Sequence, residues 1–319
     1  MTQLTQTTSG LVTDDIALPR RAKTERTGLF STRRITELTS IIGGLALWEL
    51  AARFAIHNTA FLAPPSLVAV RAWQMLLDGT LLYNGWISFQ ELIIGFVLGV
   101  VVGIAIGAAM VQWKPVDHAL EVWISALYAA PIVALAPILI IWFGFGTASK
   151  VAVVFIMVVF PMIISTQAGL ESVDRRLLLV ARSFCGSRWK TFVTVALPSA
   201  APFIVSGMRQ SVGRGLVGVV VGELFGAKAG LGNIITTASS VFDMPTLFVA
   251  VVTLTFAALS FLVGFSLLNR KPWGRVLAMV VAILQLIKIP VGTALGVYTL
   301  WVLGPSASAA EYDAIADRT

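Results

Sequence analysis

Ionisable side chains inside long apolar runs are the residues of this sequence most able to do chemistry. A charge in lipid is costly, so such groups usually face a protein interior or a water-filled path. Arg214 lies deepest, and two interpretations stay open: an ion pair with Glu91 or Glu223, or a contact for an anionic solute in a pore. Glu223 precedes the glycine-rich turn 226–232, which suits an outer gate or docking loop as well as an ordinary helix end. Three further charges lie in or near apolar runs: Glu49, Arg53 and Arg209.

The sequence lacks the motifs of a self-contained enzyme. Residues 146–150 lack the glycine before lysine that a Walker A loop needs. The two histidines, His57 and His118, lie far apart, and neither begins a His-Glu-x-x-His motif. There is no Gly-x-Ser-x-Gly elbow. We therefore expect no catalytic residue, no metal site and no nucleotide site in this chain.

The composition is that of a protein built for the bilayer. Of the 319 residues 57% are hydrophobic and 12% charged, with a mean hydropathy of +0.87. A soluble domain carries about 25% charged residues, so an ordinary soluble, disordered or disulfide-stapled protein is excluded. The single cysteine, Cys185, cannot form an intrachain disulfide. The fold class predicted is an all-α, polytopic membrane helix bundle.

Apolar segments of about 20 residues are long enough to cross a bilayer. Six candidate spans are present: 37–57, 88–111, 119–143, 150–169, 200–222 and 246–268. A further apolar stretch, 276–303, contains Lys288 and Pro290 and reads as one kinked span or a re-entrant hairpin.

The distribution of basic residues predicts the orientation. The first 35 residues carry six Lys or Arg, and the loop 170–199 carries five. The positive-inside rule therefore places the N-terminus and this loop in the cytoplasm. The opposite side is poor in basic residues, with Arg71, Lys150 and Lys228. There the segment 58–87 predicts a short amphipathic helix on the outer surface, with the spacing of Val70, Trp73 and Leu77.

Small residues and prolines mark how the spans pack. A glycine at every fourth position puts four of them on one helical face: Gly95, Gly99, Gly103 and Gly107. This stripe favours tight packing within the subunit or a surface that slides during transport. Three prolines interrupt other spans and can kink them: Pro131, Pro137 and Pro161.

The loop 170–199 predicts a short helix–turn–helix. Ala181, Phe184 and Cys185 share one helical face, Gly186 ends the turn, and Trp189 begins a new apolar face. Leu197–Pro198 is expected to stop the element before the next span. The loop is either a basic segment at the lipid headgroups or a peg that docks into another protein.

This loop resembles the EAA loop of ATP-binding-cassette importer permeases, Glu-Ala-Ala-x3-Gly-x9-Ile-x-Leu-Pro. Counting back from Leu197–Pro198 places Val195 at the Ile and Cys185 at the Gly. Residues 179–181 then stand at Glu-Ala-Ala. Ala181, the hydrophobe and the Leu-Pro are kept, whereas Leu179 replaces the Glu and the glycine is one place on, at Gly186.

The resemblance is wider than the loop and points to the nitrate/sulfonate/taurine-type permeases. It covers about residues 45–268. The segments that carry it are 48–52, 64–66, 78–79, Pro137 with 142–144, 181–184 with 187–189, 197–198 with Pro202, and 230–232.

The resemblance implies the transmembrane subunit of a type I importer in the plasma membrane. Two permease copies would form the pathway for a small anionic solute, with Arg214, Glu223 and Glu91 as candidate pathway residues. A solute-binding protein would deliver the solute to the outer face. ATP would be bound by partner subunits, so the chain itself needs no cofactor. The chain would contact membrane lipid and would not bind nucleic acid. Cytoplasmic ATPases would dock on one set of loop residues: Ala181, Arg182, Phe184, Cys185, Gly186, Arg188, Trp189, Leu197 and Pro198.

Other functions and the domain boundaries complete the expectations. A self-sufficient secondary transporter or channel is the main alternative, which inverted repeats and paired midplane carboxylates would favour. A membrane scaffold whose loop recruits a partner is another. The chain divides into a basic tail, a first span with its outer segment, a core permease domain and an appended membrane segment with the C-terminal tail: 1–35, 36–87, 88–268 and 269–319.

Overall fold

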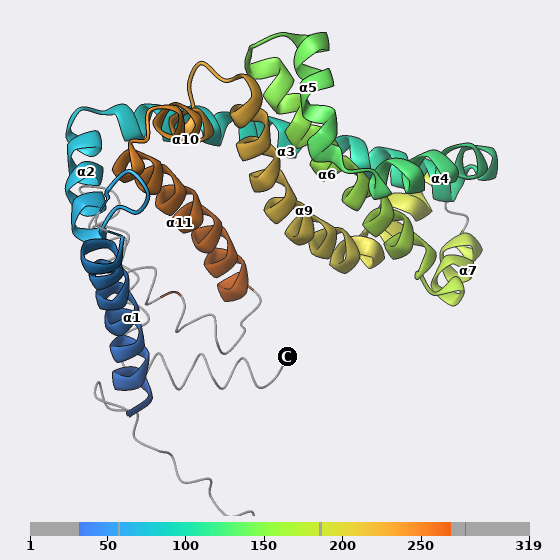
Figure 1. Cartoon of the computed structure of the whole chain (residues 1–319). Coiled ribbons are helices and arrows are strands. Elements are labelled where there is room, and N and C mark those ends of the chain that lie inside the picture. Colours follow the sequence, from blue (N-terminus) through green and yellow to red (C-terminus); the bar gives the residue numbers. More distant parts are fainter. Residues whose placement is uncertain (1–31, 57, 185–186, 269–277, 279–319) are drawn as a thin grey trace, which may run out of the picture. The chain divides into compact units, whose positions relative to one another are not determined.

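The computed structural model describes residues 32–56, 58–184, 187–268 and 278, and every element in them is a helix (Figure 1). The chain divides into two units, residues 1–41 and 42–319, and the described part of the first unit is the beginning of α1. Most of the predicted basic tail, and the appended segment 269–319 except Ala278, lie outside the described residues.

The helices follow one another with short connections. In chain order they are α1 (Thr32–Leu50), the π-helical turn η1 (Ala51–Ala55), α2 (Pro65–Leu77), α3 (Thr80–Gln112), α4 (Lys114–Ala129), α5 (Ile132–Phe143), α6 (Thr147–Glu171), α7 (Arg175–Ser183), α8 (Arg188–Thr191), the π-helical turn η2 (Phe192–Ala196), α9 (Leu197–Gly226), α10 (Leu231–Ser240) and α11 (Met244–Leu268).

Four helices in the described chain are long and apolar enough to cross a membrane: α3, α6, Arg188–Gly226 and the Met244–Phe261 part of α11. The α4–α5 pair makes a fifth if it counts as one span. The prediction of a polytopic all-α membrane bundle is confirmed. In the predicted span 37–57, residues 37–55 are helical, in α1 and η1, but this segment is not among the helices long and apolar enough to cross a membrane.

The predicted span 119–143 is not one continuous helix, and the kink expected at Pro131 is present. The span is two helices, α4 and α5, bent by 103° at their junction. The residue before a proline is pushed out of the α region, and Ala130, with ψ of 145°, is in extended conformation before Pro131. Pro131 also has no N–H to continue the helical hydrogen bonds. Pro137 and Pro161, in contrast, lie inside α5 and α6.

Helix α6 packs against both α3 and α9 (Figure 1). A Cβ atom built on Gly95 would lie 2.6 Å from the Val154 Cβ, and one on Gly103 would lie 2.5 Å from the Met162 Cβ. The two glycines between and beyond, Gly99 and Gly107, meet Val158 and Thr166 in the same way. Every fourth residue of α3 therefore lies against every fourth residue of α6, in a contact within the chain that only glycine permits.

Helix α9 approaches α6 through small residues as well. A Cβ on Gly218 would lie 3.2 Å from the Val154 Cα, and one on Gly222 would lie 3.2 Å from the Lys150 Cα. These contacts bring α9 close to α6 at the end of α6 that carries Lys150.

The sequence predicts that Leu197–Pro198 stops the loop helix before the next span, and this prediction is wrong. The helix runs from Arg188 to Gly226 through η2. A proline in an α-helix collides with the carbonyl four residues earlier, here that of Thr194. The wider π-helical turn over Phe192–Ala196 lies at this point, so the chain continues into α9.

Two segments that carry the resemblance meet at the start of α2. The Ser66 N–H donates to Glu49 Oε2 at 3.0 Å, and the Ser66 hydroxyl donates to Glu49 Oε1 at 2.7 Å. Arg53 Nε donates to the same Oε1 at 2.6 Å. A carboxylate at a helix N-terminus is favourable, so Glu49 ties the end of α1 to α2. The predicted outer helix in 58–87 corresponds to α2, whose residues Val70, Trp73 and Leu77 are exposed.

Candidate functional site

A cluster of buried charges lies where α3, α6 and α9 meet. Lys150 Nζ is 3.2 Å from Glu91 Oε1, and these residues are 4% and 0% exposed. Glu223 is 1% exposed. A buried charge is tolerated only with a partner, and here the partner of Glu91 comes from α6. The sequence predicts Lys150 at the edge of the span 150–169 and indicates no partner for it.

The Glu223 carboxylate accepts hydrogen bonds from α3 and from the start of α10. The Ser88 hydroxyl donates to Oε1 at 2.5 Å, and the Gly232 N–H donates to Oε2 at 2.5 Å. The Leu231 N–H donates to Ser88 Oγ at 2.9 Å, and the Gly230 N–H donates to Asn84 Oδ1 at 2.7 Å. Three successive N–H groups at the start of α10 are thus satisfied by side chains of other helices. We refer to Asn84, Ser88, Glu91, Lys150, Glu223 and Gly230–Gly232 as the buried polar cluster.

Glycine is required in the turn before α10 for two reasons. Gly230 has φ of +118°, a conformation that other residues rarely adopt. A Cβ at Gly230 would also collide with the Glu223 carboxyl group, and one at Gly232 would lie 2.7 Å from the Glu223 Cβ. The turn is therefore built around Glu223.

The sequence contained a signal for part of this cluster. Asn84, Ser88 and Glu91 recur at i, i+4 and i+7, which is one face of a helix. The predicted span 88–111 leaves out Asn84, whereas α3 begins at Thr80 and carries all three residues.

Arg214 lies apart from the acidic residues proposed as its partners. Its Nη2 donates to the Tyr128 hydroxyl at 2.6 Å, and its Cζ is 4.6 Å from the centre of the Tyr128 ring. Among the described residues no carboxylate is within ion-pair distance of it. The suggested pairing of Arg214 with Glu91 or Glu223 is therefore wrong. Arg214 and Tyr128 border a cavity of about 310 Å³ at the α4–α5 bend. Its lining residues are Tyr128, Ala130, Ile132, Met157, Gly213, Arg214 and Val217.

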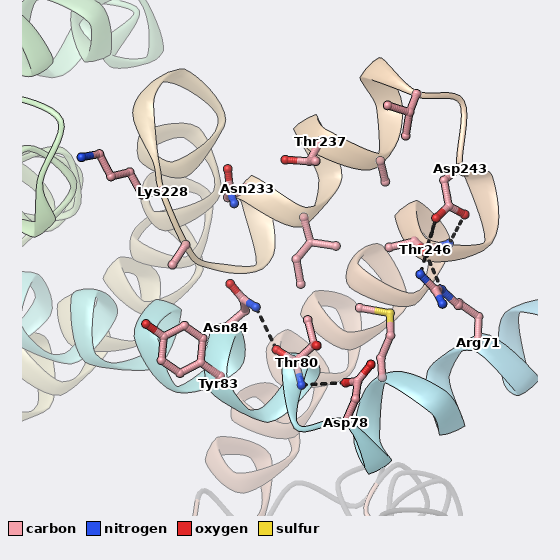
Figure 2. Close-up of a pocket in the computed structure, with 15 residues that line it drawn as sticks. Arg71, Asp78, Thr80, Tyr83, Asn84, Lys228, Asn233, Thr237, Asp243 and Thr246 are labelled. Carbon is pink, nitrogen blue, oxygen red and sulfur yellow. Dashed lines mark hydrogen bonds and ion pairs between the residues drawn. The ribbon is translucent and has the colours of Figure 1, made fainter.

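A second cavity, of about 430 Å³, is lined by residues of α2, α3, α10 and α11 and of their connections (Figure 2). Arg71 Nε donates to the Thr246 hydroxyl at 2.8 Å, and its Nη2 is 3.7 Å from Asp243 Oδ2. The Thr80 N–H donates to Asp78 Oδ1 at 2.9 Å, and this bond holds the pKa of Asp78 below its usual value. The Asn84 amide donates to the Thr80 carbonyl at 2.8 Å, so this cavity adjoins the buried polar cluster.

The segment from α7 to α8, residues 175–191, which we call the α7–α8 connection, carries two exposed aromatic residues of the candidate set. Phe184 is 83% exposed and Trp189 70%, and the Trp189 ring stacks on Phe192 with centroids 5.8 Å apart. Arg188 and Pro198 are exposed, whereas Ala181 and Leu197 are half-buried. The predicted positions Cys185 and Gly186, and the side chain of Arg182, lie outside the described residues.

The comparison with known families shows which protein family contains these sites. Residues 95–272 match the family described as binding-protein-dependent transport system inner membrane component. The chain belongs to this family. Its relatives include a riboflavin transport system permease protein, RibX, of Chloroflexus aurantiacus, 35% identical over 226 residues that cover 71% of this chain and 84% of the relative.

Two further relatives show how varied the named solutes are. The taurine transport system permease protein TauC of Escherichia coli is 28% identical over 248 residues, covering 74% of this chain and 90% of TauC. The formylaminopyrimidine transport permease protein ThiX of Halalkalibacterium halodurans is 29% identical over 235 residues, covering 72% of this chain and 92% of ThiX.

The chain is a permease subunit of an ATP-binding-cassette importer of the nitrate/sulfonate/taurine type, as predicted from the resemblance. It is an integral protein of the plasma membrane, and its family works with ATPase and solute-binding partners. Family membership thus favours this function over the self-sufficient transporter and the scaffold.

Proposed function

We propose that two copies of this permease line the path of a small anionic solute and that the loop 170–199 docks the ATPases in the cytoplasm. In this proposal ATP is held by the partner subunits, the chain has no catalytic site or cofactor of its own, and lipid surrounds the pair. The observation that carries it is the exposure of Phe184 and Trp189 on a loop between two spans. Exposed aromatic residues are typical anchors of a protein interface.

Charge supports the orientation. Arg175, Arg176, Arg188 and Lys190 all lie in this loop, beside the exposed aromatics. Cytoplasmic loops carry the excess of Lys and Arg, so this end of the bundle is placed inside, together with the N-terminus. In this orientation the buried polar cluster and the 430 Å³ cavity that Arg71 lines lie at the outer end, where a solute-binding protein would deliver the solute.

The loop departs from the family pattern at the expected acidic position. Leu179 stands there and is exposed, in α7. We expect apolar contacts from Leu179, Phe184 and Trp189 to hold the ATPase, since the charge of the usual glutamate is absent.

The outward face of α9 supports a second copy. In this membrane-length helix Ser206, Gln210 and Gly213 are exposed. Polar groups facing lipid are costly, so these residues are expected to face another permease copy or the water-filled path between the two. Arg214 belongs to the same part of α9 and favours an anion as solute.

The docking proposal can be tested by purification. The permease, purified in detergent from its native host, is expected to co-purify with an ATPase that mass spectrometry identifies. The double variant Arg188→Glu, Trp189→Glu should lose the ATPase. Lys228→Glu, an exposed charge change in the turn before α10, is the control and should keep it.

The opposite result has a clear meaning. A partner-free permease that moves solute in liposomes without ATP would replace this proposal with the self-sufficient transporter.

A further inference from the structure

We propose that the cavity between Tyr128 and Arg214 binds the transported solute during its passage, and that the solute is an organic anion with a compact apolar body. The inference rests on the proposed function, because it takes α9 to line the solute path. It goes beyond it by naming the binding place and the chemical class.

The charge of Arg214 is available to a ligand. The acidic residues of the neighbouring spans are engaged elsewhere, Glu91 with Lys150 and Glu223 with Ser88 and Gly232. A guanidinium has five N–H donors, and within the described chain one hydrogen bond of Arg214, to Tyr128, is seen. The remaining donors can bind a carboxylate or sulfonate in a forked geometry.

Tyr128 holds the guanidinium in place. The hydroxyl accepts its hydrogen bond at 2.6 Å while the ring lies 4.6 Å from the Arg214 Cζ. A cation over an aromatic face is stabilised by the ring quadrupole, most strongly away from water. Arg214 is therefore oriented before a ligand arrives.

The helix break adds to the positive field. Ile132, the first residue of α5, lines the same cavity as Arg214. Broken membrane helices bring the positive end of a half-helix to bear on anionic groups of transported solutes. The 103° bend at Pro131 therefore brings the positive N-terminal end of α5 to the cavity.

The remaining walls select the body of the solute. Ala130, Ile132, Met157 and Val217 are apolar, and they gain by covering apolar surface of a ligand. A bare inorganic anion such as nitrate would leave these walls unused. A volume of about 310 Å³ is at the small end of ligand sites and accommodates a short alkyl chain or a single ring.

The cavity can be tested by charge-selective labelling of the full chain in lipid nanodiscs. Cys185 is the single cysteine, so Cys185→Ser gives a thiol-free background, and Val217→Cys then places a thiol on the cavity wall. The probes are the methanethiosulfonates carrying a 2-sulfonatoethyl or a 2-trimethylammonioethyl group. Arg214→Gln should lower the ratio of anionic to cationic labelling rates about tenfold, the effect of removing one nearby charge.

Matched variants separate the charge from the fold. Arg214→Lys should keep most of the anionic preference, which a merely structural role of the arginine would not require. Val205→Cys is on the same helix and 46% exposed but does not line the cavity, so Arg214→Gln should leave its ratio unchanged. An equal ratio with and without Arg214 at Val217→Cys would overturn the site.

Protection tests the class of ligand. Benzenesulfonate at twice its dissociation constant should slow labelling at Val217→Cys about threefold, and only when Arg214 is present. Nitrate at the same concentration should not protect. Equal protection by nitrate would overturn the apolar body, and protection by neutral benzyl alcohol would overturn the anionic head. Labelling needs neither ATPase nor binding protein, so its failure is distinguishable from failure of ATP-driven uptake.

Discussion

The buried polar cluster and the α7–α8 connection lie at opposite ends of α6 and α9 and use their side chains in opposite ways. In the cluster, Glu91, Lys150 and Glu223 are between 0% and 4% exposed, and each has partners on another element. In the connection, Phe184 and Trp189 are exposed to solvent. Buried groups with partners on other helices hold the helices together, whereas exposed aromatic side chains are available for another protein. Changes in the cluster should therefore cost stability, and changes in the connection should cost coupling.

Lys150→Met should have the largest effect on stability. It leaves Glu91 buried without its counter-charge, and breaking such a pair costs about 3–5 kcal/mol. We expect a large drop in the thermal unfolding midpoint of the detergent-solubilised permease, or loss of folded protein.

The double variant Glu91→Gln, Lys150→Met removes both charges and should recover most of this loss. If the single and double variants are equally unstable, packing by the lysine chain rather than charge pairing explains the effect, and the contrast with the exposed connection weakens.

Trp189→Glu should have a large effect of the other kind. The residue is exposed, so the unfolding midpoint should change by less than about 0.5 kcal/mol in equivalent stability. The loss of an aromatic interface anchor typically costs about 2 kcal/mol or more, and we expect ATP hydrolysis to be uncoupled from solute uptake. The ratio of solute imported to ATP hydrolysed in proteoliposomes measures this, and an unchanged ratio would refute the docking surface.

Gly103→Ala should lower stability by about 1–3 kcal/mol, because the new methyl group needs the space of the Met162 Cβ. Gly85→Ala is the matched control on the same helix, since nothing lies within 4 Å of its added Cβ. It should be neutral or stabilise by up to about 1 kcal/mol through helix propensity. Thermal unfolding of both variants decides whether the glycine stripe is a packing contact, and a tolerated Gly103→Ala would favour a sliding surface.

Arg214→Ala should give the smallest change, because the residue is half-buried and its loss leaves no buried carboxylate unpaired. We expect uptake of an anionic solute to fall about two- to tenfold, which corresponds to the net free energy of one or two hydrogen bonds. Recovery of the ATPase on purification should be unaffected. Normal uptake would return Arg214 to a structural contact with Tyr128.

Hydrophobic length and local turn chemistry predicted much of the fold. The predicted spans 88–111, 150–169, 200–222 and 246–268 all lie within α3, α6, α9 and α11. The predicted span 88–111 begins eight residues after the start of α3 and leaves out Asn84, which contacts α10 together with Ser88. Both residues are part of the helix because Glu223 and the N–H groups of α10 satisfy them. A polar residue looks like a loop residue when its distant partner is unknown.

The sequence by itself determined the class of protein, because a charged fraction of 12% and runs of about 20 apolar residues leave only the bilayer as environment. It also determined the glycine repeat and the aromatic residues of the α7–α8 connection. Only the tertiary structure decided that Glu91 pairs with Lys150 and that Arg214 contacts Tyr128. Partner choice among buried charges depends on which helix faces meet, and the close glycine contacts of α6 with α3 and α9 set that geometry.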